Sequence, residues 1–205
     1  MLRPFSKFRS ALPVTCFLAI CFSGFGLGMP LAGAEESVAV GLKPGDPLGT
    51  FRVIKIAGAK DDGVEVGQSL CYRCRYGSNP IVMVFARKAS TEIDSLIGVL
   101  EKSVEKSLET QQMQRLCAFV VLVGQDRSEL NESAVALIQR TGAEMIPAVV
   151  TEDATSGPLD YQLSSANDVT VVVAKDSQVV AVETFGIEKI EPKRISDHID
   201  AMLAP

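Results

Sequence analysis

Four continuous apolar segments constrain the fold of this 205-residue chain more than any other feature of its sequence. They span residues 81–86, 116–123, 145–150 and 169–174. An apolar run without alternation is typical of a strand that is buried on both faces. Amphipathic segments separate the first three runs, and this alternation of buried strands with helices indicates a parallel core with right-handed crossovers. The sequence therefore predicts an α/β protein with a central sheet.

Two predicted helices lie between these strands. Ser90 or Thr91 can cap the first helix, because side-chain oxygens accept hydrogen bonds from the free backbone N–H groups of a first turn. Its apolar residues recur at helical spacing: Ile93, Leu96, Ile97, Leu100, Val104 and Leu108. Asp126 or Ser128 begins the second helix, which we expect to end at Gly142. Its expected inward-facing residues are Val135, Leu137 and Ile138.

Strand hairpins are predicted on both sides of this core. Residues 51–56 alternate Phe, Val and Ile with Arg and Lys, which predicts a half-buried strand. A turn at residues 60–63 leads to residues 64–70, the predicted partner strand. Near the C-terminus, a turn at residues 175–177 joins the fourth apolar strand to residues 179–185. The late hairpin therefore adds antiparallel strands to the parallel core.

Two prolines refine the boundaries of these elements. Pro147 lies inside the third apolar run and predicts an edge position or a late start for that strand. Pro192 marks the first turn of a last helix. The residues that share a face of that helix are Ile195, Ile199, Met202 and Leu203. Residues 151–168 are expected to form a loop that carries a short helix.

The first 34 residues have the pattern of an export signal. Arg3, Lys7 and Arg9 make the start basic, and no acidic residue precedes Glu35. Residues 11–28 are mostly apolar, and Ala-Gly-Ala at 32–34 supplies the small residues of a cleavage site. A retained membrane anchor is the alternative, since the apolar run is at the short edge of the roughly 18 to 25 residues that span a bilayer. We expect a secreted or periplasmic protein.

This interpretation divides the chain into a signal peptide (1–34), a lead-in rich in Gly and Pro (35–50) and one domain (51–205). Without the signal, 17 basic residues remain against 25 acidic ones, a net charge of −8. That acidity excludes a basic stripe for phosphates, so no nucleic-acid partner is expected. No stable membrane span is expected after signal removal. No cofactor motif is present, and we expect no cofactor.

Cys71 and Cys74 form the main candidate site, in the sequence Cys71-Tyr72-Arg73-Cys74. Two thiols at this spacing can close into a disulfide, and the positive charges of Arg73 and Arg75 favour the thiolate that attacks other disulfides. In an oxidising compartment a close Cys pair favours a disulfide over a metal site. Three interpretations remain open: a structural disulfide, a redox-active dithiol, and a metal site.

A zinc site would need about four ligands. Only Cys117 and His198 could complete the set, and they lie in distant elements. Cys117 lies within an apolar strand and is expected to be a small core residue rather than a resolving thiol. His198 is expected to be a partly exposed residue on the flank of the last helix.

The order of elements resembles the thioredoxin-like fold, in the longer redoxin or peroxiredoxin-like form with an added N-terminal hairpin. The resemblance covers residues 45–203, and its most telling part is Val-Thr-Val-Val-Val at 169–173, followed by Asp176 and Val-Val at 179–180. It implies a three-layer α/β/α architecture with a mixed central sheet. It also implies thiol–disulfide chemistry with a protein partner.

The chain departs from that family at both hallmarks of the usual site. The family places its reactive Cys directly after the first central strand, where this chain has residues 87–92 without a cysteine. The position of the family's cis-proline corresponds here to Val169, preceded by Asp168. The Cys pair instead precedes the central strand. Since six strand residues span about 20 Å, the pair is expected near the opposite end of that strand, unless the linking segment folds back.

Two functions therefore remain open. The first is an exported thioredoxin-like protein with thiol–disulfide redox activity, in which Cys71 attacks and Cys74 resolves. The second is a non-catalytic binding or scaffold module in which the pair is a structural disulfide. Peroxidase action is disfavoured, because no Cys stands at the start of the first helix, where the family places its peroxidatic residue.

Overall fold

A computed structural model describes residues 41–110, 114–152 and 155–204. Within these residues, seven strands form one mixed sheet in the order β2-β1-β5-β4-β3-β6-β7. The strands are β1 (Val53–Ala57), β2 (Ser69–Leu70), β3 (Ile81–Ala86), β4 (Cys117–Leu122), β5 (Ala148–Thr151), β6 (Val169–Lys175) and β7 (Gln178–Phe185). The three central strands β3, β4 and β5 are parallel, and the outer neighbours pair antiparallel to them.

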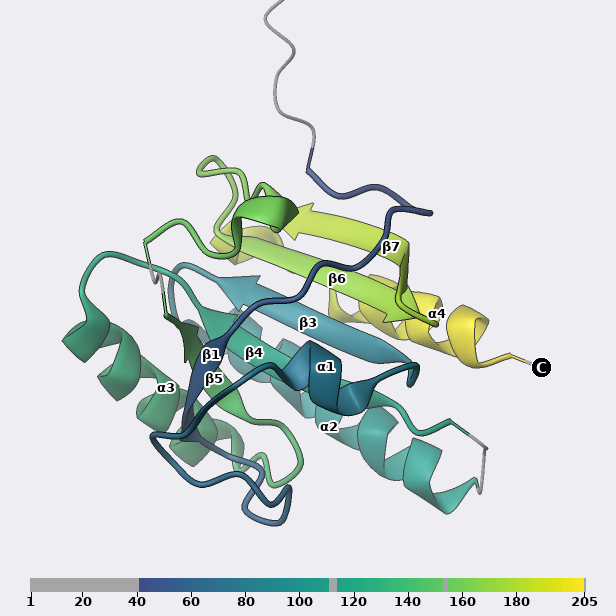
Figure 1. Cartoon of the computed structure of the whole chain (residues 1–205), viewed down its shortest axis with the longest axis horizontal. Coiled ribbons are helices and arrows are strands. Elements are labelled where there is room, and N and C mark those ends of the chain that lie inside the picture. Colours follow the sequence, from purple (N-terminus) through teal and green to yellow (C-terminus); the bar gives the residue numbers. More distant parts are fainter. Residues whose placement is uncertain (1–40, 111–113, 153–154, 205) are drawn as a thin grey trace, which may run out of the picture. The chain divides into compact units, whose positions relative to one another are not determined.

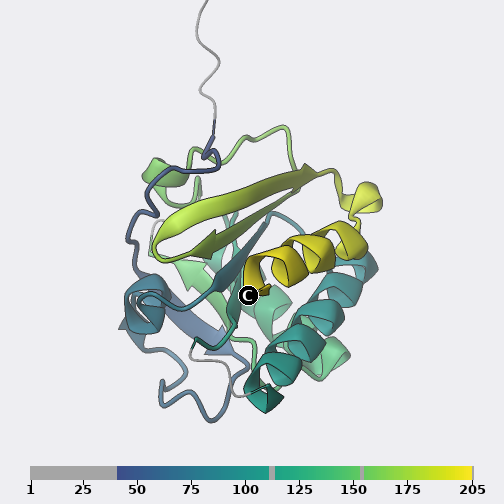
Figure 2. The same cartoon turned by 90° about the vertical axis from the view of Figure 1, so that its right-hand side faces the viewer.

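Helices cover both faces of this sheet (Figures 1 and 2). The helical elements are α1 (Tyr72–Tyr76), α2 (Thr91–Glu109), α3 (Arg127–Thr141), η1 (Leu159–Tyr161), η2 (Ile187–Lys189) and α4 (Pro192–Leu203). The three long helices α2, α3 and α4 bury their apolar sides in one core cluster. On the other face, α1, η1 and the lead-in enclose a second cluster rich in aromatic rings. The predicted three-layer α/β/α architecture is confirmed.

The strands β3 and β4 are apolar on both sides because each core cluster takes alternate residues from them. Val82 and Val84 lie in the cluster under the long helices, whereas Met83 and Phe85 lie in the cluster under α1 and η1. Residues 81–86 are all buried. This two-sided burial is the physical reason for the continuous apolar run at the centre of the sequence.

Local signals located the helix ends correctly. The Ser90 side chain caps α2, and the Asp126 carboxylate accepts hydrogen bonds from the first turn of α3. Gly142 ends α3 in the left-handed conformation, with φ 64°. The prediction that Val135 faces inward is wrong. Val135 is exposed, because the buried stripe of α3 consists of Leu130, Ala134 and Leu137.

One strand boundary agrees with the prediction and another differs from it. β5 starts only at Ala148, so Pro147 precedes the strand, in agreement with the late start. The N-terminal hairpin is present, but its second strand is only Ser69–Leu70 and not residues 64–70. Residues 58–68 instead form a loop that wraps around the side chain of Lys55, whose Nζ donates to the backbone oxygens of Ala59 and Val64.

The polarity of β1 is also different from the expectation. In a half-buried strand with alternating residues, the basic side chains at 51–56 would face solvent. Lys55 is in fact only 2 % exposed, whereas Ile54 and Ile56 are half-buried on the opposite face. A buried lysine needs polar partners to offset the loss of water, and the loop after β1 supplies them.

The predicted signal peptide at 1–34 and the first six residues of the lead-in, 35–40, lie outside the described residues. The described part of the lead-in is bridged to β7 through Pro47 and Gln178. The described residues of the lead-in and of the predicted domain belong to one compact unit. Among the residues that the structure describes, no helix is long and apolar enough to span a membrane.

Candidate functional site

Cys71 and Cys74 form a disulfide at the start of the short helix α1. Their Cα atoms lie 5.2 Å apart. Cys71 is the N-cap residue, and its Sγ accepts a hydrogen bond from the backbone N–H of Cys74 at 3.1 Å. Cys74 is exposed and Cys71 is half-buried. The site therefore presents a disulfide to solvent on a defined turn of helix.

Aromatic packing holds α1 against the sheet. The ring of Tyr72 stacks on Phe119 of β4, with centroids 5.5 Å apart, and Tyr76 lies 6.1 Å from the same ring. Tyr72 is 1 % exposed. Burial raises the pKa of both tyrosine hydroxyls far above the ordinary range, and in Tyr72 a hydrogen bond to the Asp62 carboxylate adds to that rise.

The two arginines beside the cysteines interact with different parts of the structure. The exposed Arg75 donates from Nη2 to the backbone oxygen of Asp62. Arg73 is half-buried, and its Nε has no hydrogen-bond partner among the described residues. Burial raises the pKa of Tyr161, and the positive charge of Arg73 counteracts part of that rise. Arg73 and Arg75 thus stand on either side of Cys74 in the sequence of α1, and their side chains interact with Tyr161 and Asp62.

The disulfide does not lie where thioredoxin-like proteins usually carry theirs. α1 and α2 cover opposite faces of the sheet (Figure 2). The segment that links the Cys pair to β3 folds back over the sheet. Tyr72 stacks on Phe119, and Phe119 is the register partner of Met83 in the middle of β3. The pair thus begins over the middle of the sheet and not beyond the end of β3.

The family's usual position for the reactive Cys, at the carboxyl end of β3, has other side chains in this chain. A cavity of about 430 Å³ there is lined by residues 86–89, together with residues from β4 and α3, and contains no cysteine. Lys88 Nζ lies 3.7 Å from the carboxylate of Asp168. The backbone N–H of Arg87 donates to the backbone oxygen of Asp168 at 2.9 Å. An ion pair therefore joins the segment where the family has its reactive Cys to Asp168, the residue before the counterpart of the cis-proline.

Neither Cys117 nor His198 joins the disulfide. Cys117 is half-buried at the start of β4, and burial raises the pKa of its thiol to about 11. His198 Nε2 lies 2.8 Å from Glu183 of β7. Within the described residues, no group of three or more His, Cys, Asp or Glu side chains is arranged to hold a metal ion. The four residues of the metal interpretation are not brought together.

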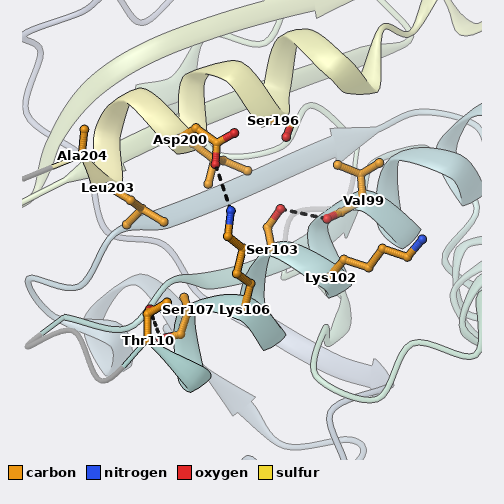
Figure 3. A pocket seen from close by; sticks show the side chains of 11 residues that line it. Val99, Lys102, Ser103, Lys106, Ser107, Thr110, Ser196, Asp200, Leu203 and Ala204 are labelled. Carbon is orange, nitrogen blue, oxygen red and sulfur yellow. Dashed lines mark hydrogen bonds and ion pairs between the residues drawn. The ribbon is translucent and has the colours of Figure 1, made fainter.

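A separate cavity of about 410 Å³ lies between the C-terminal halves of α2 and α4 (Figure 3). Polar and aliphatic side chains share its walls, and Lys106 extends across it toward Asp200, 3.9 Å away. Ser107 lies at its edge, but its hydroxyl is already used within the fold by Val104 and Leu116. This cavity is on the face of the sheet opposite the disulfide and contributes nothing to it.

The helix α1 itself was not anticipated from the sequence. A single turn has no periodicity to detect, but two weak signals were present. Tyr72 and Tyr76 stand four residues apart, which places both rings on one face of a helix. Gly77 then ends the turn with φ 61°, a conformation that glycine adopts without strain.

Comparisons with known proteins agree with this architecture. No protein-family model and no curated protein matches the sequence. Among solved structures, AhpC from Mycobacterium bovis has a TM-score of 0.58 at 12% identity, covering 80% of this chain and 94% of its own. A protein described as thiol:disulfide interchange protein DsbE from Chlorobium tepidum has a TM-score of 0.57 at 11% identity, covering 80% and 99%.

A thiol:disulfide interchange protein from Bacteroides sp. has a TM-score of 0.55 at 12% identity, covering 79% of this chain and 91% of its own. Identities this low establish the fold alone. These structural matches, together with the seven-stranded mixed sheet and its N-terminal hairpin, show that this chain has the thioredoxin-like fold in its redoxin-like form.

Proposed function

We propose that this protein is an exported thiol–disulfide exchange protein that works through Cys71 and Cys74. The observation that carries the proposal is the disulfide itself, exposed at Cys74 and capped so that Cys71 Sγ already accepts a backbone hydrogen bond. A hydrogen bond to the charged form of a group favours that form. The same contact stabilises a Cys71 thiolate when the disulfide opens.

The exchange reaction transfers two electrons between this protein and a partner. The Cys71 thiolate attacks a partner disulfide, which forms a mixed disulfide and releases one partner sulfur as a thiolate. The Cys74 thiolate then attacks Cys71 Sγ, restores the internal disulfide and releases the second partner sulfur. The partner has gained two electrons and this protein has lost them, while the released partner thiolates take up protons from water. The reverse sequence oxidises a partner dithiol.

Two features of the site favour different cysteines as the attacking thiolate. The greater exposure of Cys74 favours access by a partner, whereas the hydrogen bond to Sγ favours the thiolate at Cys71. We assign the attack to Cys71, because the thiolate is the reactive species. Arg73 and Arg75 are assigned as cations that stabilise this thiolate.

Export is the second part of the proposal, and it rests on the sequence of residues 1–34. Disulfides persist in oxidising compartments and are rare in the cytosol. Solved structures with the same fold include proteins described as thiol:disulfide interchange proteins. A secreted or periplasmic protein whose partner is a protein thiol or disulfide is consistent with both observations.

A catalytically silent scaffold with a structural disulfide is the alternative. The burial of Tyr72 favours it, since α1 belongs to the core and a bridge over so short a loop can simply fasten it. A loop of this length gives stabilisation at or below the lower end of the usual ~2–4 kcal/mol. The usual site of the fold also has no cysteine.

Trapping of the mixed disulfide distinguishes these two functions. Reduced Cys74→Ser protein is mixed with oxidised glutathione, and the adduct is located by mass spectrometry. We expect a stable glutathione adduct on Cys71, because the resolving sulfur is absent. The matched Cys71→Ser variant is expected to react more slowly at Cys74. Absence of an adduct in both folded variants would exclude exchange and leave the scaffold function.

A further inference from the structure

The most deeply buried charge among the described residues lies close to α1. Lys55 in the middle of β1 is 2 % exposed, and its Nζ lies 2.7 Å from Oδ1 of Asp62. The ammonium also donates to the backbone oxygens of Ala59 and Val64, each at 2.8 Å. All three donors of the ammonium group are therefore used. A buried ion pair is weak evidence for stability, because desolvation of the two charges offsets their attraction.

The Asp62 carboxylate connects this ion pair to the disulfide helix. Its Oδ2 accepts a hydrogen bond from the Tyr72 hydroxyl at 2.5 Å, and its Oδ1 also accepts from the backbone N–H of Val64 at 2.8 Å. Arg75, one turn further along α1, donates to the backbone oxygen of Asp62. Both ends of this helix are thus tied to one residue of the β1–β2 loop.

We propose that Lys55, Asp62 and Tyr72 are positioning residues that keep α1 helical when the Cys71–Cys74 disulfide is reduced. This inference rests on the proposed redox function and names the residues that maintain its reactive geometry. None of the three side chains exchanges electrons. Their role is to hold the turn in which Cys71 Sγ faces the N–H of Cys74.

The argument depends on what constrains the turn in each redox state. In the oxidised protein the S–S bond itself holds residues 71 and 74 together. In the dithiol that restraint is gone, and a helix of five residues is not stable alone. The contacts of Tyr72 then maintain the turn, since Tyr72 directly follows Cys71 and its hydroxyl is fixed by Asp62.

This asymmetry predicts the direction of the effect. Loss of the Tyr72 hydroxyl loosens α1 mainly in the dithiol form, because the disulfide still closes the turn in the oxidised form. The reduced state loses its hydrogen bond to Cys71 Sγ and becomes less favourable relative to the disulfide. The reduction equilibrium therefore moves toward the disulfide, and the Cys71 thiol pKa rises. A residue with a purely structural role would destabilise both redox states equally and leave the equilibrium unchanged.

The test is the equilibrium constant of the Cys71–Cys74 pair with glutathione, measured in four variants. We expect Tyr72→Phe and Asp62→Asn to shift it about fivefold or more toward the disulfide, as the loss of a hydrogen bond to a charged group implies. The controls are Tyr161→Phe, another buried tyrosine that donates to Gly49, and Asp61→Asn, the exposed neighbour. Both controls are expected to stay within about twofold of the original protein.

Tyr72→Phe keeps the inference testable if Asp62→Asn does not fold, because it retains the ring and leaves the ion pair intact. If Tyr72→Phe has the same equilibrium constant as the original protein, the positioning role is overturned, whatever the reduction potential of the original protein. If glutathione leaves the disulfide fully oxidised, the same constants are measured against a stronger dithiol reductant, and a shift in Tyr72→Phe then supports the positioning role and contradicts the redox function. The two claims therefore fail separately.

Discussion

The ring of Tyr72 lies stacked on Phe119, with centroids 5.5 Å apart and planes inclined by 28°. One ring belongs to the disulfide helix and the other to the central strand β4, where Phe119 is fully buried. This contact joins the disulfide helix to the buried centre of the sheet. It also means that a single side chain of the core supports both Tyr72 and Tyr76.

Truncation of Phe119 should therefore destabilise the whole protein. Phe119→Ala removes a buried ring from the cluster under α1, and we expect a loss of about 3–5 kcal/mol in the free energy of unfolding. Leu159→Ala is the matched control, since Leu159 is 80 % exposed and its loss should cost less than about 0.5 kcal/mol. Urea denaturation of the oxidised proteins measures both values. Equal losses in the two variants would show that the stacking contact is not part of the core.

The sequence was sufficient for the sheet and the long helices because their signals are local or periodic. The continuous run at residues 81–86 reflects burial on both faces, and Ser90, Asp126 and Gly142 act within one turn of the helices that they end. The resemblance to thioredoxin-like proteins came from the order of these elements. Comparison with solved structures confirms that fold.

The surroundings of the disulfide could not be predicted in the same way. Lys55 reads as an exposed residue of an alternating strand, and only the folded loop reveals that Ala59, Asp62 and Val64 enclose it. Tyr72 is buried because of Phe119, which lies 47 positions later in the chain. Contacts of this kind depend on tertiary packing, so one sequence contains no local signal for them.

The charge of Arg75 should lower the thiol pKa of Cys71 in the reduced protein. Arg75→Gln removes a nearby cation, so we expect the thiolate to form at higher pH. The shift should be less than about one pH unit, because Arg75 is exposed and solvent screens its charge. Lys88→Gln, at the usual site of the fold, should leave the titration unchanged. The pH dependence of alkylation at Cys71 measures both, and an equal shift in the two variants would contradict the assignment of Arg75.

Cys117 should be a slow thiol in the folded protein. Burial raises its pKa from 9.0 to about 11, so at pH 8 its thiolate fraction is about 100-fold lower than in the unfolded chain. Iodoacetamide labelling of the Cys117 peptide should be slower by a similar factor in native protein than in urea. Because the folded state holds this proton more tightly, stability should also fall as the pH rises from 9 to 11. Labelling at the same rate in both states would show that Cys117 is accessible.

The reduction potential of the Cys71–Cys74 pair tests the central claim most directly. It is obtained by equilibrating the folded protein with glutathione buffers, quenching with acid and counting alkylated thiols by mass. A thiol–disulfide exchange protein should give a value between about −120 and −270 mV, the range of known oxidoreductases. A value below about −300 mV would identify a structural disulfide and contradict the redox function.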